Sequence, residues 1–128
     1  MVVAANPYAS WAGKNIIEKG GSAIDAAIAV QAMLTLVEPQ SSGIGGGAFI
    51  LYWDNQEKKL YTIDGRETAP AAVNAYWFMQ GNKQMDWLDA VVGGKSVGVP
   101  GVLRGLELAH DKFGKLPWKA LFSDAIRQ

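Results

Sequence analysis

The chain of 128 residues contains no cysteine and a single histidine, and each of these absences excludes a kind of site. Without cysteine there is no disulfide framework, no thiolate nucleophile and no cysteine-ligated zinc. One histidine cannot build a metal site from several imidazole groups within the chain. Thiol chemistry and histidine-rich metal centres are therefore excluded, and the sequence predicts no metal site.

The chain also lacks an excess of charge and a long apolar run. Lys and Arg together number 12, as do Asp and Glu, so no electrostatic footprint indicates nucleic acid or an anionic membrane. No apolar run reaches the length of a membrane span, and the start, Met1 to Asn6, lacks the basic and long apolar regions of a signal peptide. With 49% hydrophobic and 19% charged residues, the composition is that of one globular domain. The composition does not indicate a cellular compartment.

What the chain does have is glycine, with four in the five positions Gly43 to Gly47. Gly43-x-Gly45-x-x-Ala48 fits the dinucleotide-binding fingerprint formally, but that fingerprint needs a strand before the glycines and a helix after them. Here a helix pattern, Ala23 to Val37, precedes the run and a strand pattern, Ala48 to Trp53, follows it. The run is not followed by the Gly-Lys-Ser or Gly-Lys-Thr of a P-loop either. It predicts a tight helix-to-strand connection close to a packed or reactive centre.

Apolar residues at helical spacing predict four helices: one after Asn6-Pro7, one over Ala23 to Val37, one over Val102 to Phe113 and one from Pro117. The first ends at Gly20-Gly21, where Gly20 suits a left-handed cap position. Ser22 and Asp25 form a capping-box pair at the start of the second. That helix is apolar almost all round, which is typical of a helix inside a layered protein.

Strand patterns are shorter. Met1 to Ala5 predicts a short buried strand, and Ala48 to Trp53 and Lys59 to Ile63 predict two strands joined by the polar hairpin loop 54–58. The segment Ala71 to Lys95 is weakly patterned. Its large apolar residues are expected to pack short helical turns against the core: Trp77, Phe78, Met79, Trp87 and Leu88.

Taken together, the motifs resemble the N-terminal part of the large subunit of a gamma-glutamyltranspeptidase. Five pieces occur in the order of that family, with a sixth, Phe113 to Trp118, closing the series: Ala12-Gly13, Gly20 to Ala27, Glu38 to Gly47, Ile63 to Pro70 and Gly98 to Gly101. Two small departures are Ser22 in place of the family's usual Asn, and Asn6-Pro7-Tyr8 in place of a commoner His-Pro. The resemblance implies an α/β (α+β) fragment of an N-terminal nucleophile hydrolase αββα sandwich. Residues 1–128 would form a single partial domain, truncated at its C-terminal end.

The resemblance also implies an activity. The parent would move the γ-glutamyl group of glutathione or related compounds to water, amino acids or peptides through an acyl-threonine intermediate, without metal or cofactor. The family's nucleophile is the threonine that autoprocessing exposes at the N-terminus of the small subunit, with its free amine as base. Thr35, Thr62 and Thr68 are internal and none sits in that motif. The chain alone is therefore expected to be inactive. Its expected partners are the rest of the large subunit and the small subunit, and the family suggests a periplasmic or extracellular site.

Among the residues, the resemblance makes Arg66 the candidate substrate-binding residue, because the arginine of Arg66-Glu67-Thr68-Ala69-Pro70 would bind the α-carboxylate of the γ-glutamyl group. Taken without the family, Arg66 is better interpreted as a surface ion-pair partner of Asp64 or Glu67 than as a substrate-binding residue. These two acids are interpreted as supports for the arginine or solvated loop charges, and His110 as a partly packed surface histidine.

Two other functions stay open on the sequence: a related acylase or amidohydrolase of the cephalosporin-acylase type, and a non-catalytic binding or structural module. Apolar faces meant for missing elements would favour self-association of the isolated chain.

Overall fold

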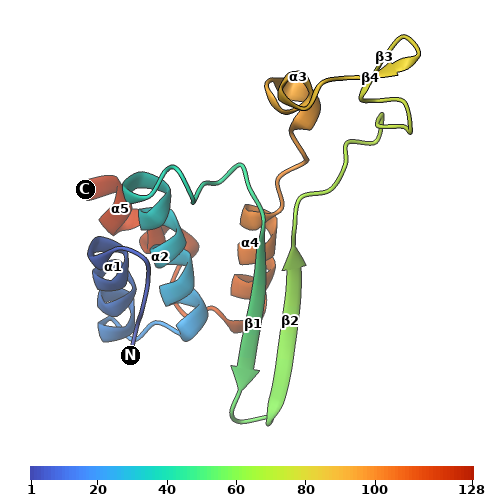
Figure 1. The fold of residues 1–128 in the computed structure, drawn as a ribbon. Coiled ribbons are helices and arrows are strands. Elements are labelled where there is room, and N and C mark those ends of the chain that lie inside the picture. Colours follow the sequence, from blue (N-terminus) through green and yellow to red (C-terminus); the bar gives the residue numbers. More distant parts are fainter.

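Helices lie against one side of a long β-hairpin, and a thin arm extends beyond the end of the second strand (Figure 1). The computed structural model describes all residues, 1–128. Its main helices and strands are α1 (Pro7–Glu18), α2 (Ala23–Val37), β1 (Ala48–Asp54), β2 (Lys59–Gly65) and α4 (Val102–Phe113). The chain closes with the 3-10 turn η2 (Trp118–Phe122) and the short helix α5 (Ser123–Arg127). No helix is both long and apolar enough to cross a membrane.

The first two helices begin and end where their terminal residues predict. The Asn6 side chain caps α1 by accepting a hydrogen bond from the Tyr8 N–H (3.0 Å), and Gly20 adopts the left-handed conformation, with φ of 87°, between the helices. Ser22 and Asp25 form both bonds of the capping box at the start of α2. The Asn6 amide also donates to Glu38 at the far end of α2, and this bond lowers the pKa of Glu38.

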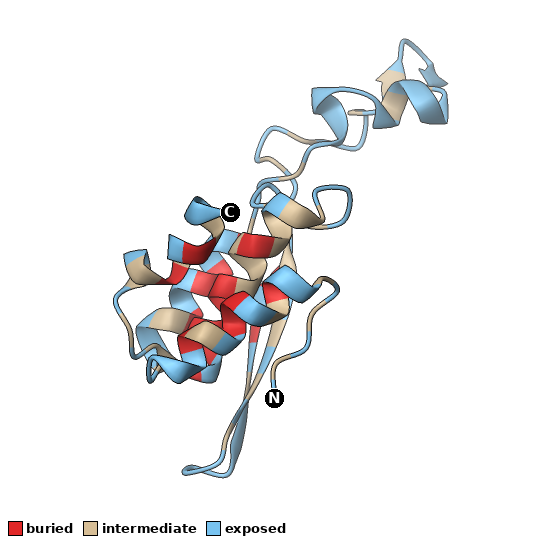
Figure 2. Ribbon diagram, turned by 90° about the vertical axis from the view of Figure 1, so that its left-hand side faces the viewer, coloured by how far each residue is buried: buried red, intermediate tan, exposed pale blue.

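The core lies among the helices and reaches only one face of the hairpin (Figure 2). Ile28 of α2 and Leu121 of η2 are almost completely buried, and Val102, Leu106 and Ala109 bury one face of α4. Burying a side chain the size of Ile28 contributes roughly 1.5–3 kcal/mol. The buried hydrophobic residues of the core are Ala9, Ala12 and Ile16 of α1, Ile24, Ala26, Ile28, Ala29 and Met33 of α2, Ile63 of β2, Val102, Leu106 and Ala109 of α4, and Leu121.

The hairpin pairs antiparallel, from Ala48 opposite Gly65 to Asp54 opposite Lys59. Asp54 closes the loop, because its carboxylate accepts from the N–H groups of Gln56 (2.8 Å) and Glu57 (3.2 Å). The inner face packs on α4, where Tyr52 stacks on Phe113 with ring centroids 4.3 Å apart. The outer face carries Phe49, Leu51 and Trp53, all exposed, so both faces of this two-stranded sheet are apolar.

Three predictions about local structure are wrong. Residues 1–5 form no strand, and Met1 and Val3 are exposed, because no neighbouring strand offers their backbone a partner. The helix expected from Pro117 begins instead as the 3-10 turn η2, with Pro117 before its first residue, and continues as α5. Leu121 still points inward, as its spacing predicts.

The third wrong prediction is that the large apolar residues of the segment 71–95 pack against the core. Residues 71–97, called the arm here, instead project away from it (Figures 1 and 2). The arm contains the short pair β3 (Met79–Gln80) and β4 (Lys83–Gln84), the helix α3 (Trp87–Val91) and the 3-10 turn η1 (Gly94–Ser96). No residue of α3 is buried, and Trp87 is 74% exposed. Local hydrogen bonds within the arm hold it together: the Trp77 indole donates to the Lys95 carbonyl, the Ser96 hydroxyl donates to the Val91 carbonyl, and β3 pairs with β4.

Candidate functional site

Arg66 stands directly after β2, between two carboxylates. Its backbone N–H donates to the Asp64 carboxylate (2.9 Å), and its guanidinium Nη1 donates to Glu67 Oε2 (2.5 Å). The Arg66 side chain is 64% exposed, whereas that of Glu67 is 26% exposed. Only Nη1 of the guanidinium is bonded within the chain, so the other N–H donors are free for a ligand.

Two glycine-containing loops, one with Gly47 and one with Gly98 and Gly101, lie very close to the backbone that carries Arg66. A Cβ atom at Gly47 would lie 2.5 Å from Glu67 Oε2 and 2.9 Å from the Cα of Arg66. A Cβ at Gly98 would lie 2.9 Å from the Cβ of Glu67, and one at Gly101 would collide with the carbonyl oxygens of Gly65 and Arg66. Side chains at these positions would displace Arg66 and Glu67, so the glycines fix where the arginine stands.

Backbone hydrogen bonds join the same loops across the site. The Gly46 carbonyl accepts from the N–H groups of Gly101 and Val102, each at 3.1 Å, which ties the glycine run to the start of α4. Thr68 and Val99 exchange both backbone bonds, at 2.8 and 3.3 Å. The glycine run therefore connects helix to strand beside the Arg66 segment, as predicted, with α2 before it and β1 after it. That order excludes a dinucleotide cradle.

Close approach, rather than an unusual backbone conformation, explains the key glycine of the run. None of Gly43, Gly45, Gly46 or Gly47 has a positive φ, because the positive-φ glycines are Gly20, Gly81 and Gly93. A Cβ at Gly45 would meet no atom within 4 Å, in contrast to one at Gly47. The four glycines thus have different roles, which their spacing alone does not reveal.

A cavity of about 370 Å³ lies beside the arginine and is called the Arg66 cavity here. Its walls are residues 66–70, Val73, Trp77 and Phe78 from the start of the arm, and residues 95–98 from its end. Its charged residues are Arg66, Glu67 and Lys95. Its volume falls in the range of small-ligand pockets, and its converging charges give it a means of orienting a ligand. A larger hollow of about 990 Å³ lies among the N-terminal residues, α1 and α2; it is mainly apolar, and its charged side chains, Lys14 and Glu18, pair with each other.

Two hydroxyl groups line this cavity, those of Thr68 and Ser96, and the Ser96 hydroxyl donates to the Val91 carbonyl (2.7 Å). The Thr35 hydroxyl donates to the Gln31 carbonyl (3.0 Å) on α2, and Thr62 lies within β2. Thr68, which does line the cavity, is internal to the chain and therefore has no free amine. No three His, Cys, Asp or Glu side chains lie close enough to hold a metal ion. The charged groups at the cavity are the two cations Arg66 and Lys95 and the single carboxylate Glu67.

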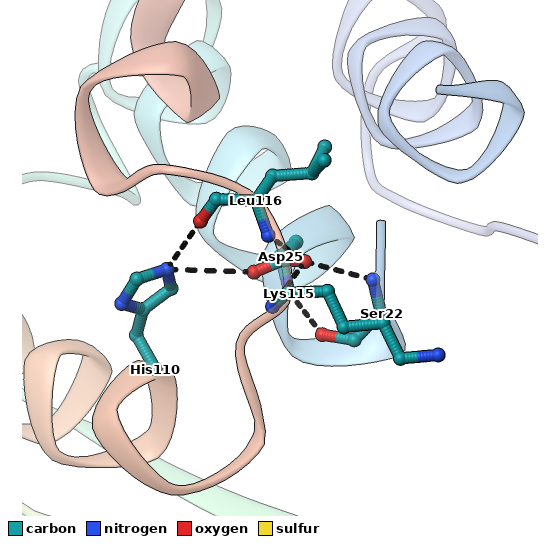
Figure 3. A network of polar contacts seen from close by, with 5 residues as sticks. All are labelled: Ser22, Asp25, His110, Lys115 and Leu116. Atoms are coloured by element: carbon teal, nitrogen blue, oxygen red, sulfur yellow. Dashed lines mark hydrogen bonds and ion pairs between the residues drawn. The ribbon is translucent and has the colours of Figure 1, made fainter. Parts of the chain in front are cut away.

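The single histidine takes part in a separate, structural network at the other end of α4 (Figure 3). Asp25 is fully buried, and its Oδ2 accepts from the N–H groups of Ser22 (2.8 Å), Lys115 (2.9 Å) and Leu116 (3.1 Å). His110 Nε2 lies 2.8 Å from the Leu116 carbonyl and 3.6 Å from Asp25 Oδ1. His110 is partly packed, as expected. The part of Asp25 in joining α2 to residues 115–116 was missed, because the sequence shows only its local capping partner.

Sequence comparison extends the family pattern over almost the whole chain. A sequence profile of the family described as Gamma-glutamyltranspeptidase matches residues 9–128, a span that includes the whole Arg66 cavity. The chain belongs to the gamma-glutamyltranspeptidase family. Among its relatives, the glutathione hydrolase proenzyme of Bacillus subtilis (strain 168) is 44% identical over 128 residues, which are 99% of this chain and 22% of the relative. Scoloptoxin SSD14 of Scolopendra dehaani is 46% identical over 91% of this chain and 19% of its own length.

Solved gamma-glutamyltranspeptidase structures confirm the expected fold class. The enzyme from Pseudomonas nitroreducens, complexed with L-DON, superposes with a TM-score of 0.92 at 36% identity, covering 98% of this chain and 37% of that one. The Helicobacter pylori enzyme gives a TM-score of 0.93 at 31% identity, over 99% and 36% of the two chains. This chain thus spans about a fifth of its curated relatives, and its mixed helices and strands match part of an N-terminal nucleophile hydrolase fold.

Proposed function

We propose that this chain is the donor-anchoring part of an enzyme that transfers a γ-glutamyl group to water, amino acids or peptides. The donor would be glutathione or a related γ-glutamyl compound, and Arg66 would bind its α-carboxylate. Residues 1–128 would form one partial domain that acts with the rest of the large subunit and with the small subunit. Membership of the gamma-glutamyltranspeptidase family supports the reaction class. The relatives named glutathione hydrolase support the donor.

The observation that carries the role of Arg66 is its guanidinium with unpaired donors at a cavity wall, on a backbone that glycines hold in place. A guanidinium can bind a carboxylate through two parallel hydrogen bonds and stays charged at any working pH. Glu67 occupies one side of the guanidinium through Nη1, which limits its rotation and leaves its remaining donors for the ligand. A carboxylate bound there would be oriented as well as attracted.

Anchoring one end of the donor contributes to catalysis because it positions the γ-carbonyl. With its α-carboxylate held, the γ-carbonyl several bonds away has fewer orientations available, which raises its effective concentration at a nucleophile. The nucleophile would be a threonine outside residues 1–128. Its hydroxyl would form an ester with the γ-glutamyl group as the donor's amide bond breaks, and its hydroxyl proton would pass through the terminal amine to the leaving amine. Water or an amine acceptor would then cleave the ester.

The test compares arginine variants in the complete enzyme. Arg66→Ala should lower kcat/KM for a γ-glutamyl anilide by roughly 30- to 5,000-fold. This corresponds to a loss of about 2–5 kcal/mol in transition-state binding, as expected for loss of a charged anchor. Arg66→Lys should recover only part of this loss, because an ammonium cannot fork onto a carboxylate. Arg104→Ala is the matched control, since Arg104 pairs with Glu107 on α4 outside the cavity. Near-normal donor kinetics in Arg66→Ala would rule out the anchoring role.

A related acylase is the second candidate, and one comparison favours keeping it. The structure of a cephalosporin acylase from Bacillus halodurans superposes with a TM-score of 0.76 at 35% identity, over 95% of this chain and 22% of that one. Assaying the complete enzyme with a γ-glutamyl anilide against a glutaryl anilide separates the two. The glutaryl group keeps the carboxylate that Arg66 would bind and lacks only the α-amino group, so a γ-glutamyl enzyme that also binds the ammonium should prefer the first substrate. Preference for glutaryl would establish the acylase instead.

A further inference from the structure

Lys95 is the second cation of the Arg66 cavity, and it comes from the opposite end of the arm. The two sides of the arm are joined at this point, because the Trp77 indole N–H donates to the Lys95 carbonyl (2.9 Å). The Lys95 ammonium donates in turn to the Trp77 carbonyl (3.3 Å) and lies 5.9 Å from the centre of the indole ring. The backbone of Lys95 is thus held at the cavity, while its side chain remains exposed.

The charge of Lys95 has no acidic partner in the chain. No carboxylate lies within 4.0 Å of its ammonium, and its other neighbour is the Met85 sulfur at 3.8 Å. The only acid of the cavity, Glu67, is paired with Arg66. The cavity therefore carries one uncompensated positive charge in addition to the arginine, and an anionic ligand would be attracted to both.

A phosphate-binding interpretation of the Gly94-Lys95-Ser96 triplet fails on its surroundings. A P-loop needs a glycine five positions before Gly94, where Asp89 stands, and a full helix after the serine. Here η1 is three residues long and leads into extended chain rather than a helix. The triplet is therefore not a phosphate-binding loop, and the Lys95 ammonium can pair with a carboxylate as a point charge.

We infer that Lys95 is a specificity-determining residue that binds a second carboxylate of the donor, on its leaving-group side. This inference rests on the proposed function, in which Arg66 holds the α-carboxylate. Donors that end in a free carboxylate, as γ-glutamyl peptides do, would then be preferred over donors with a neutral leaving group. Lysine suits this contact because its flexible point charge tolerates leaving groups of different length, whereas the forked arginine fixes the common end.

The experiment uses two donors that differ only in that carboxylate. Glutathione and its glycine monoethyl ester have the same α-carboxylate and the same scissile bond. In the complete enzyme, Lys95→Met should raise KM for glutathione and lower its kcat/KM by about 3- to 10-fold, as for a partly solvated charged contact. The ester should change by less than about twofold. Lys95→Arg should retain most of the preference, because it retains the charge.

Lys83→Met serves as the matched control, since Lys83 is an exposed lysine on β4 of the same arm and does not line the cavity. It should change neither donor. An equal loss for both donors, or an unchanged ratio between them, would overturn the role of Lys95 while leaving the proposed function standing. A wild-type enzyme that uses neither donor would instead refute the proposed function itself. Sodium chloride at high concentration should also reduce the preference of the wild type for glutathione over its ester.

Discussion

At the scale of single residues, the position of Arg66 depends on neighbouring positions that lack a side chain as well as on its own ion pair. Arg66 and Glu67 form their ion pair beside two positions that have no side chain, Gly47 and Gly98. The sequence indicates a crowded glycine loop but cannot tell which glycine is crowded, because the crowding atoms belong to residues some 20 positions away. The structure assigns that role to Gly47, and Gly45 has open space in the same run.

The difference between the crowded Gly47 and the open Gly45 gives a prediction. Gly47→Ala in the complete enzyme should push the added methyl group against Glu67 and the Arg66 backbone, at a cost of about 1–3 kcal/mol in stability. It should also lower kcat/KM for the donor, because the guanidinium moves with its backbone. Gly45→Ala is the control, since its Cβ would meet no atom within 4 Å and its φ is not positive. Urea unfolding midpoints and donor kinetics measure both effects, and equal behaviour of the two variants would contradict this assignment.

At the scale of elements, the fold was predictable wherever the signal is local. Gly20 and Ser22 mark where α1 ends and α2 begins, and the polar loop 54–58 marks the hairpin, because each signal acts within a few residues of the boundary it sets. Partners distant in sequence were not predictable. The bonds from Lys115 and Leu116 to Asp25 span 90 residues or more, and the contact between Trp77 and Lys95 depends on how the arm folds back.

The Asp25 network gives the prediction at this scale. Asp25→Ala should destabilise the complete protein by about 3–5 kcal/mol, because it leaves the partly buried N–H groups of Lys115 and Leu116 without their acceptor. Ser22→Ala removes one capping bond of the same helix and should cost only about 1 kcal/mol. Thermal and urea unfolding of both variants checks the ranking. Similar costs for the two would show that Asp25 acts only as a helix cap.

At the scale of the whole molecule, the exposed apolar surface is the dominant feature. Only 19 of 128 residues are buried, and the outer face of the hairpin exposes Phe49 (70%) and Leu51 (73%). A strand that is apolar on both faces is typical of a sheet covered on both sides. The chain spans 22% of the Bacillus subtilis relative, and a complete protein of that length would have other residues that could cover this face. The aromatic residues of the arm were predicted to pack against the core, but Trp87 is 74% exposed and no residue of α3 is buried.

The outer face also predicts how the isolated chain behaves. Residues 1–128 alone should self-associate and bind a hydrophobic dye, because a contiguous exposed apolar strand face recruits a second copy in the absence of its cover. Leu51→Lys should reduce this self-association in the isolated chain, yet destabilise the complete protein, where the same charge would be buried without a partner. Gln56→Lys, in the exposed hairpin loop, is the control and should change neither. Analytical ultracentrifugation of the isolated chain and urea unfolding of the complete protein provide the two readings. A monodisperse wild-type fragment that unfolds cooperatively would show that the outer face needs no cover.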